Sequence, residues 1–298
     1  MQQLVQQILN GLVIGSVYVL IASGLTVIFG VMNIVNFAHG EFYMLGSLCT
    51  ILLFNFLHLN FILTVFLSII IVAIIGLACE RVIHLVSHLP IGDYLYATSL
   101  ITIGLSIFVA NTLNVIVGPR PRMIQGLPSF PVDLGIGTLP FMKIVVFTVA
   151  IVATAAFNIY MHRTRWGKAT LATFEHREAA QAMGINIRAI DRTTFALGVA
   201  MAGLGGALIG SVYYFVPTMG MGVIAKAFAV TIIGGLGSFT GAIAAGLLLG
   251  IVESLVTGYV SSSVTNVASF SIMVLVLLLM PRGMGVLLSR VRRGSALI

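Results

Sequence analysis

Seven long stretches of this chain contain no Asp, Glu, Lys or Arg: residues 1–40, 42–79, 94–119, 144–162, 193–225, 227–252 and 254–281. Most of them exceed the roughly 20 residues that a helix needs to span a bilayer. Only 8% of the 298 residues are charged, whereas soluble domains carry about 25% charged residues. Backbone within lipid must satisfy its own hydrogen bonds. The sequence therefore predicts an all-α, polytopic transmembrane helical bundle and not a barrel, which would show short alternating segments.

The placement of the basic residues predicts the topology. Ten of the fifteen Lys and Arg residues lie in 162–193 and 282–298, and cytoplasmic loops collect such residues. We therefore expect 162–193 to be a cytoplasmic loop, the C-terminus to be cytoplasmic and the N-terminus to be outside. The net charge of +7 is then a topology signal, and we expect no nucleic-acid partner. The segment 118–140 holds five of the eight prolines and is expected to be an external loop.

Hydropathy predicts membrane segments at 8–30, 34–56, 61–83, 95–117, 141–161, 194–216, 226–260 and 266–281. A cytoplasmic C-terminus needs an even number of crossings after residue 193, but only three of these segments follow it. The segment 226–260 must therefore be divided. Glycine weakens helices, so Gly234, Gly235, Gly237 and Gly241 mark a broken or re-entrant helix. The prediction is a single transmembrane domain, 1–298, with about eight or nine membrane segments.

Small residues four positions apart predict close helix packing. They occur at Gly11/Gly15, Ala202/Gly206/Gly210 and Gly246/Gly250. Such spacing places small residues on one helical face, where a neighbouring helix can approach.

The basic loop contains a segment typical of a short surface helix, residues 175–183, followed by Gly184 as its stop. Glu175 and Glu178 would lie in its first turns, where carboxylates favour the positive helix end. A weakly apolar surface formed by Ala179, Ala180, Ala182 and Met183 could dock into a groove on a partner protein. A solvated connector helix explains the same residues equally well.

Four polar residues lie beside or inside predicted membrane segments: Asn33, Asn36, His39 and Glu41. Helical spacing would place Asn33, Asn36 and Gly40 on one face, with His39 close to it. Polar groups at membrane depth face a bundle interior or a wet path. They are therefore candidates for a substrate path, while interhelical hydrogen bonds that only fix packing are the alternative. No second histidine stands at metal-ligand spacing, so we expect no metal site and no cofactor.

Two isolated charged residues and two cysteines also lie in or beside apolar stretches. Glu253 and Lys226 are expected to be charges near helix ends at the membrane surface, with a gate residue and a protein-docking residue as the alternatives. Cys49 and Cys79 fall in apolar runs, and we expect both to be small packing residues.

Four segments of the chain resemble one family. Residues 178–184, Glu-Ala-Ala-Gln-Ala-Met-Gly, are similar to the EAA…G coupling element of ATP-binding-cassette importer permeases. Residues 163–169 (RTRWGKA), residues 24–42 (GLTVIFGVMNIVNFAHGEF) and the glycine run 234–241 are similar to the permeases of branched-chain amino acid (Liv) importers. The chain departs from the longer EAA consensus after Gly184, where Ile187-Arg188-Ala189 replaces the expected apolar-proline ending.

This resemblance implies a permease of the bacterial inner membrane that works with other subunits. It implies cytoplasmic ATPases that engage Glu175, Glu178, Ala179, Ala180, Met183 and Gly184. It also implies a second, related permease chain and a periplasmic binding protein that delivers leucine, isoleucine or valine. The chain has no P-loop, because Gly167-Lys168 is followed by Ala169 and His162 occupies the first glycine position. We therefore expect a transport subunit and not an enzyme.

Two other transport functions stay open at this point. Urea or a short amide is an alternative cargo within the same family. An ion-coupled secondary transporter is a different class, since broken helices and mid-membrane carboxylates such as Glu41 would suit it.

Overall fold

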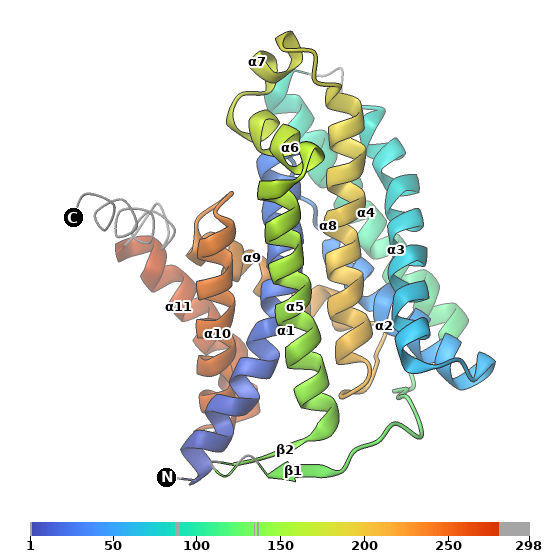
Figure 1. Cartoon of the computed structure of the whole chain (residues 1–298), viewed down its shortest axis with the longest axis vertical. Coiled ribbons are helices and arrows are strands. Elements are labelled where there is room, and N and C mark those ends of the chain that lie inside the picture. Colours follow the sequence, from blue (N-terminus) through green and yellow to red (C-terminus); the bar gives the residue numbers. More distant parts are fainter. Residues whose placement is uncertain (1, 87–89, 134, 136, 280–298) are drawn as a thin grey trace.

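The computed structural model describes residues 2–86, 90–133, 135 and 137–279, and most of its long helices run side by side (Figure 1). The basic tail 282–298, expected to be cytoplasmic, lies outside the described residues. In chain order the elements are α1 (Gln2–Met32), α2 (His39–Leu57), α3 (Phe61–His84), α4 (Ile91–Val117), β1 (Pro131–Asp133), β2 (Thr138–Pro140), α5 (Phe141–Arg163), α6 (Arg165–Glu175), α7 (Arg177–Ala182), α8 (Ile187–Ile209), α9 (Met219–Gly234), α10 (Phe239–Tyr259), the 3-10 turn η1 (Ser262–Val264) and α11 (Thr265–Leu279).

Eight helical segments within the described residues are long and apolar enough to cross a membrane, and α9 is a shorter apolar helix of 16 residues. This confirms the predicted polytopic bundle. One predicted span was misplaced, because α8 covers 187–209 and not 194–216. Asn186 starts α8 early by accepting a hydrogen bond from the Ala189 N–H, so the charged residues that follow belong to the helix and not to a loop.

The two predicted loops lie at opposite ends of the bundle. The basic segment folds into α6 and α7 at the top of Figure 1, an end we name the α6–α7 end. The proline-rich segment lies at the bottom beside the N-terminus, an end we name the hairpin end. It is not wholly irregular, because β1 and β2 pair antiparallel with Pro131 opposite Pro140.

The segment predicted to be divided is divided, and its first helix starts earlier than expected, at Met219. Helix α9 begins where Gly220 packs against Gly40 of α2, and the turn after it reaches the α6–α7 end, where Gly237 packs on Phe174. Helix α10 returns to the hairpin end, where Gly258 contacts Gln7 of α1, and α11 follows. The described chain after residue 186 thus forms four α-helices, α8, α9, α10 and α11, of which α9 is the shorter apolar one.

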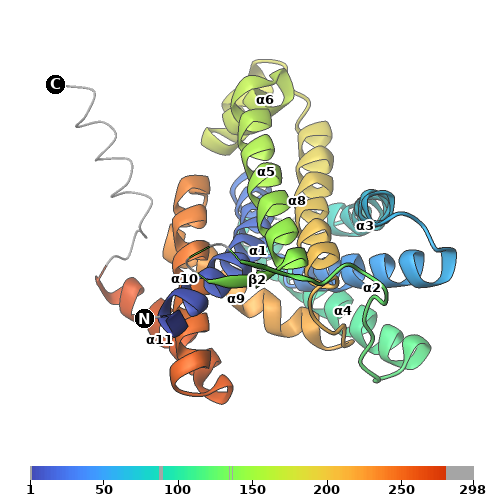
Figure 2. The same ribbon diagram turned by 60° about the horizontal axis from the view of Figure 1, so that its bottom comes forward.

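Helices α1 and α8 form the buried centre of the bundle, whereas few residues of α3, α4 and α11 are buried. Figure 2 shows α1 between α10 on one side and α8 on the other. The predicted glycine spacings lie at these crossings. A Cβ on Gly11 of α1 would stand 2.5 Å from Ile251 Cα of α10, and one on Gly15 would stand 2.9 Å from the Gly246 carbonyl oxygen. A side chain at either position would force the two helices apart.

Candidate functional site

The expected surface helix 175–183 is interrupted in the structure. Helix α6 ends at Glu175, and α7 starts at Arg177 because His176 is extended and its Nδ1 accepts from the Ala179 N–H at 3.2 Å. The prediction that Glu175 lies in the first turn of this helix is therefore wrong, since it is the last residue of α6. Glu178 does lie in the first turn of α7, where its carboxylate is favourable.

The exposed face of α7 is smaller than the sequence predicted. Glu178, Ala179 and Met183 are exposed, and Met183 is 84% accessible. Ala180 is buried against the bundle, so it cannot belong to a surface that a partner touches. Gly184 follows with φ +86°, a left-handed conformation in which glycine carries no steric penalty. The chain thus presents a short helix with a sharp stop at the α6–α7 end.

Arg177 ties α7 to the two central helices. Its guanidinium donates to both carboxylate oxygens of Asp191 in α8, at 3.0 Å from Nη1 and 2.5 Å from Nη2. Nη1 also donates to the carbonyl oxygen of Val31 in the last turn of α1, at 2.9 Å. Bidentate arginine–carboxylate pairs fix geometry as well as charge. Arg177 therefore connects α7 directly to the last turn of α1 and to the N-terminal part of α8.

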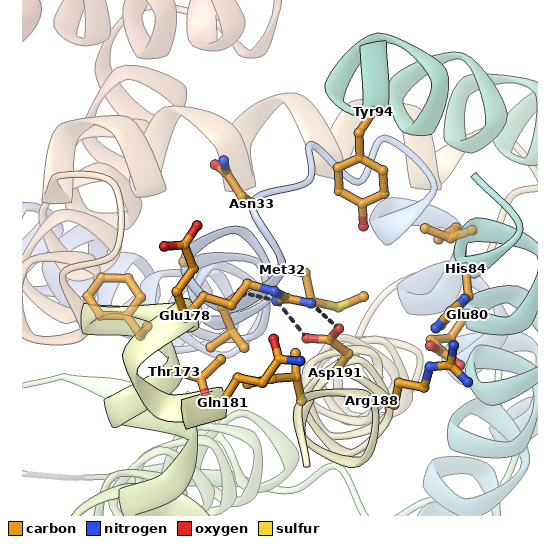
Figure 3. Close-up of a pocket in the computed structure, with 16 residues that line it drawn as sticks. Met32, Asn33, Glu80, His84, Tyr94, Thr173, Glu178, Gln181, Arg188 and Asp191 are labelled. Carbon is orange, nitrogen blue, oxygen red and sulfur yellow. Dashed lines mark hydrogen bonds and ion pairs between the residues drawn. The ribbon is translucent and has the colours of Figure 1, made fainter. Parts of the chain in front are cut away.

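A cavity of about 670 Å³ opens beside this link (Figure 3). Side chains from α1, α3, α4, α6, α7 and α8 line it. Two predicted site residues, Asn33 and Glu178, lie on its wall, and so do Glu80, Arg188 and Asp191, which the sequence did not single out. The wall carries both signs of charge where α6 and α7 meet the bundle.

The segment between α1 and α2 is not helical, so the prediction that Asn33, Asn36 and Gly40 share a helical face is wrong. Asn33 ends α1 in the left-handed conformation, φ 54°, with its N–H bonded to the Phe29 carbonyl. Asparagine tolerates this conformation better than most residues. Thr102 of α4 holds the connecting segment by donating to the Val35 carbonyl at 3.2 Å.

The four predicted path residues separate into two places. Asn33 is exposed at the cavity, whereas Asn36, His39 and Glu41 are buried inside the bundle. His39 Nε2 donates to the Ile21 carbonyl of α1 at 3.1 Å. The amide of Asn36 makes no hydrogen bond to any described residue. Buried amides that lack protein partners are typical of groups that meet water or a ligand.

Glu41 lies in the first turn of α2 and faces two other helices. Its Oε1 accepts from Ser106 Oγ of α4 at 2.9 Å. Its Oε2 lies against Gly220 of α9, where a Cβ would come within 2.7 Å of that oxygen. The carboxylate thus stands at the junction of α2, α4 and α9, and Ser106 and Gly220 are neighbours that sequence reasoning missed.

The prediction that Glu253 and Lys226 are charges at the membrane surface is wrong. Glu253 is 3% exposed, and its Oε2 accepts from Lys226 Nζ at 3.0 Å and from Tyr18 Oη at 2.6 Å. Its Oε1 accepts from Ser269 Oγ of α11. This cluster of Tyr18, Lys226, Glu253 and Ser269 joins α1, α9, α10 and α11 inside the bundle.

The glycine run forms the turn between α9 and α10. Gly235 and Gly237 have φ 94° and 84°, values that other residues rarely adopt. Gly234 and Gly241 approach backbone to backbone across the turn, where a Cβ on Gly234 would lie 2.6 Å from the Ala242 nitrogen. Ser238 caps α10 by accepting from the Gly241 N–H at 3.1 Å.

Among the residues that the structure describes, no three His, Cys, Asp or Glu side chains lie close enough together to hold a metal ion. Cys49 and Cys79 are both free and partly buried. The chemistry available at the α6–α7 end is therefore that of ion pairs, hydrogen bonds and a mixed polar and apolar cavity.

Comparison with known proteins identifies relatives along nearly the whole chain. Residues 7–280 match the model of the family described as branched-chain amino acid transport system / permease component. The high-affinity branched-chain amino acid transport system permease protein LivH of Salmonella typhimurium is 34% identical over 293 residues, which cover 93% of this chain and 94% of the relative. BraD of Pseudomonas aeruginosa, described in the same words, is 32% identical over 296 residues, with 93% and 94% covered.

More distant matches add little. The autoinducer 2 import system permease protein LsrC of Escherichia coli is 30% identical over 122 residues, which cover 39% of this chain and 34% of LsrC. The solved structure of PsaBC from Streptococcus pneumoniae in complex with Fab matches at 14% identity, covers 90% of each chain and has a TM-score of 0.48.

Proposed function

Because the chain belongs to the family of branched-chain amino acid transport permease components, we propose that it forms the membrane path of an ATP-driven importer for leucine, isoleucine and valine. The observation that carries this proposal is similarity over 93% of the chain to relatives named as permeases for this cargo. The chain is a multi-pass inner-membrane protein and a transport subunit. Its partners are cytoplasmic ATPases, a second and related permease chain, and a periplasmic binding protein.

The α6–α7 end is the cytoplasmic end of the permease in this proposal. The charge pattern of 162–193 supports this orientation, because that segment contains six basic residues: Arg163, Arg165, Lys168, Arg177, Arg188 and Arg192. The hairpin end, the N-terminus and the segment 118–140 then face outward, and the C-terminus is cytoplasmic.

The exposed face of α7 is the docking surface for an ATPase. Glu178, Ala179 and Met183 offer a carboxylate and a small apolar patch, which suit a helix that lies in a groove. Gly184 sets the direction in which the chain leaves this helix. Glu175 lies at the edge of the same surface, and Ala180 supports it from below. Because Arg177 joins α7 to Asp191 and to the Val31 carbonyl, ATPase movement reaches α8 and α1 through this contact.

The substrate path passes the junction of α2, α4 and α9. Asn36 offers amide groups without protein partners among the described residues, and Glu41 offers one free carboxylate oxygen there. His39 holds the start of α2 against α1. The turn of Gly234, Gly235, Gly237 and Gly241 reverses the chain between α9 and α10 at the opposite end of α9 from this junction. The path closes and opens when these helices shift, and the chain performs no covalent chemistry.

Purification of the tagged chain from its native membrane tests this proposal. We expect Walker-motif ATPases and a second permease to copurify in mild detergent, and the reconstituted complex to import labelled leucine only with ATP and the binding protein. Isolation of a folded chain without these partners, together with leucine uptake driven by an ion gradient, would contradict it. Import of urea and not of leucine would contradict the cargo alone.

A further inference from the structure

A buried carboxylate without a hydrogen-bond partner faces the cavity at the α6–α7 end. Glu80 lies near the end of α3, its side chain is 1% exposed, and neither of its oxygens accepts a hydrogen bond from any described residue. Arg192 Nε stands 3.7 Å from Glu80 Oε2, beyond hydrogen-bond length, on a side chain that is 54% exposed. A buried charge is costly without close partners. A cationic group of a ligand could reach the Glu80 carboxylate through the cavity.

Among the charged residues that line the cavity, Glu80 and Arg188 are the oppositely charged pair that is available to a ligand. Arg177 is occupied by Asp191 and the Val31 carbonyl. Arg188 of α8 makes no ion pair among the described residues, and it lies on the same side of the cavity as Glu80 and His84 (Figure 3). Glu178 lies on the opposite side, near Thr173. A carboxylate and a guanidinium on one wall match a ligand that carries an ammonium and a carboxylate on neighbouring atoms.

The rest of the wall suits an aliphatic group of modest size. Val31, Met32, Ile83 and Ile187 line the cavity beside the charged residues. Its volume of about 670 Å³ falls within the range of about 300–1,000 Å³ found for small-molecule sites. A neutral polar molecule such as urea would leave both the charges and this apolar surface unmatched.

We propose that this cavity binds a zwitterionic aliphatic α-amino acid from the α6–α7 side of the membrane. Glu80 accepts the ammonium group, Arg188 donates to the carboxylate, and the aliphatic side chain lies against Ile83 and Ile187. This inference rests on the proposed function, which makes that side cytoplasmic and supplies such an amino acid as cargo. An amino acid bound in this cavity lies beside the Arg177–Asp191 contact. Amino acid that has accumulated in the cytoplasm therefore occupies the site and slows the transport cycle.

The test uses the assembled importer in proteoliposomes with the α6–α7 end facing the outer medium and the binding protein with labelled leucine inside. Unlabelled L-leucine is added outside, and ATP-driven transport of the label into the medium is measured. We expect added leucine to reduce the initial rate. Equal concentrations of 3-methylbutylamine, which lacks the carboxylate, and of 4-methylpentanoate, which lacks the amine, should leave the rate unchanged.

Two variants remove one end of the site each. Glu80→Gln and Arg188→Gln should each raise the half-inhibitory leucine concentration about tenfold or more, as expected for the loss of a charged hydrogen bond. Arg188 is exposed, so its variant keeps the test valid if the buried Glu80→Gln fails to fold. Asp93→Asn, an exposed acidic residue of α4, is the matched control and should keep the wild-type value.

The outcomes separate the two proposals. A wild-type importer that does not transport leucine at all would contradict the proposed function, and with it this inference. Leucine transport that is insensitive to added leucine, or equally sensitive in Arg188→Gln and in wild type, would overturn the cavity site and leave the proposed function intact. Inhibition by the amine or by the carboxylate alone would also overturn it.

Discussion

Lys226 of α9 and Glu253 of α10 form an ion pair inside the helical bundle, with 3.0 Å between Nζ and Oε2. Tyr18 of α1 donates to the same carboxylate oxygen, and the Lys226 ammonium lies 5.5 Å from the centre of the Tyr18 ring. Ser269 of α11 donates to the other oxygen. The pair therefore holds the two halves of the divided helix against α1 and α11, at a depth where an unpaired charge is expensive.

Loss of one partner of this pair should destabilise the permease more than loss of both. Lys226→Met leaves the buried Glu253 carboxylate without its cation, and we expect a loss of about 3–5 kcal/mol. The double variant Lys226→Met/Glu253→Gln should regain a large part of that loss, because no buried charge is left. Thermal unfolding of the detergent-purified chains measures both. Equal melting temperatures for the single and the double variant would contradict a direct pair.

Close helix crossings should make small substitutions costly at chosen glycines. Gly11→Ala places a Cβ 2.5 Å from Ile251 Cα, so α1 and α10 must separate, at a cost of about 1–3 kcal/mol. Gly104→Ala on α4 meets nothing within 4 Å and should be neutral or slightly stabilising, because alanine favours helices. Midpoints of thermal unfolding for the two variants provide the comparison. A Gly11→Ala protein as stable as Gly104→Ala would rule out the tight crossing.

Most of the fold could be predicted from the sequence, because a membrane-spanning helix is recognised from its own run of apolar residues. Uncharged stretches located the spanning helices, and the glycine run located the turn between α9 and α10. The errors occurred where polar residues belong to helices. Arg188 and Asp191 were assigned to a loop, although Asn186 already starts α8 before them. His176 divides α6 from α7 through its side-chain hydrogen bond, which no periodicity reveals.

The candidate site was less predictable, because its pairs join residues far apart in the chain. Arg177 and Asp191 are 14 positions apart, and Lys226 and Glu253 are 27 apart. Spacing alone cannot pair them, since pairing depends on how the helices cross. A signal existed, however. Glu253 and Lys226 are isolated charges within long apolar stretches, and a buried partner explains such charges as well as the membrane surface does.

The left-handed conformation of Gly184 should be needed for coupling to the ATPases. Gly184→Val puts a branched side chain at φ +86°, which costs roughly 1–2 kcal/mol and turns the chain out of its path. Gly184→Asn is the matched control, because asparagine tolerates this conformation. We expect import to fall strongly in the valine variant and little in the asparagine variant, at equal amounts of inserted protein. Equal loss in both would indicate that the absence of a side chain, and not the backbone angle, matters.

The contact of Arg177 with Asp191 should transmit movement and not merely stabilise the fold. Arg177→Gln leaves Asp191 and the Val31 carbonyl without their donors. We expect import to fall about tenfold while the assembled complex still hydrolyses ATP. Arg177→Lys should be intermediate, because a single ammonium cannot reproduce the bidentate contact. Arg165→Gln, an exposed arginine at the start of α6, is the control. A parallel loss of ATP hydrolysis and import would favour a docking role for Arg177.

Single cysteines should separate the two places where the predicted path residues lie. In a background without Cys49 and Cys79, cysteine at Asn33 should react at once with a water-soluble thiol reagent, because this position is exposed at the cavity. Cysteine at Asn36 should be inert in the resting state, since Asn36 is fully buried. If the path passes Asn36, ATP together with the loaded binding protein should make that cysteine reactive. Cysteine at Val72, a fully buried apolar position of α3, should stay inert under both conditions. If ATP does not change the reactivity of the cysteine at position 36, Asn36 has a packing role only. The same conclusion follows if the cysteine at position 72 becomes reactive under the same conditions.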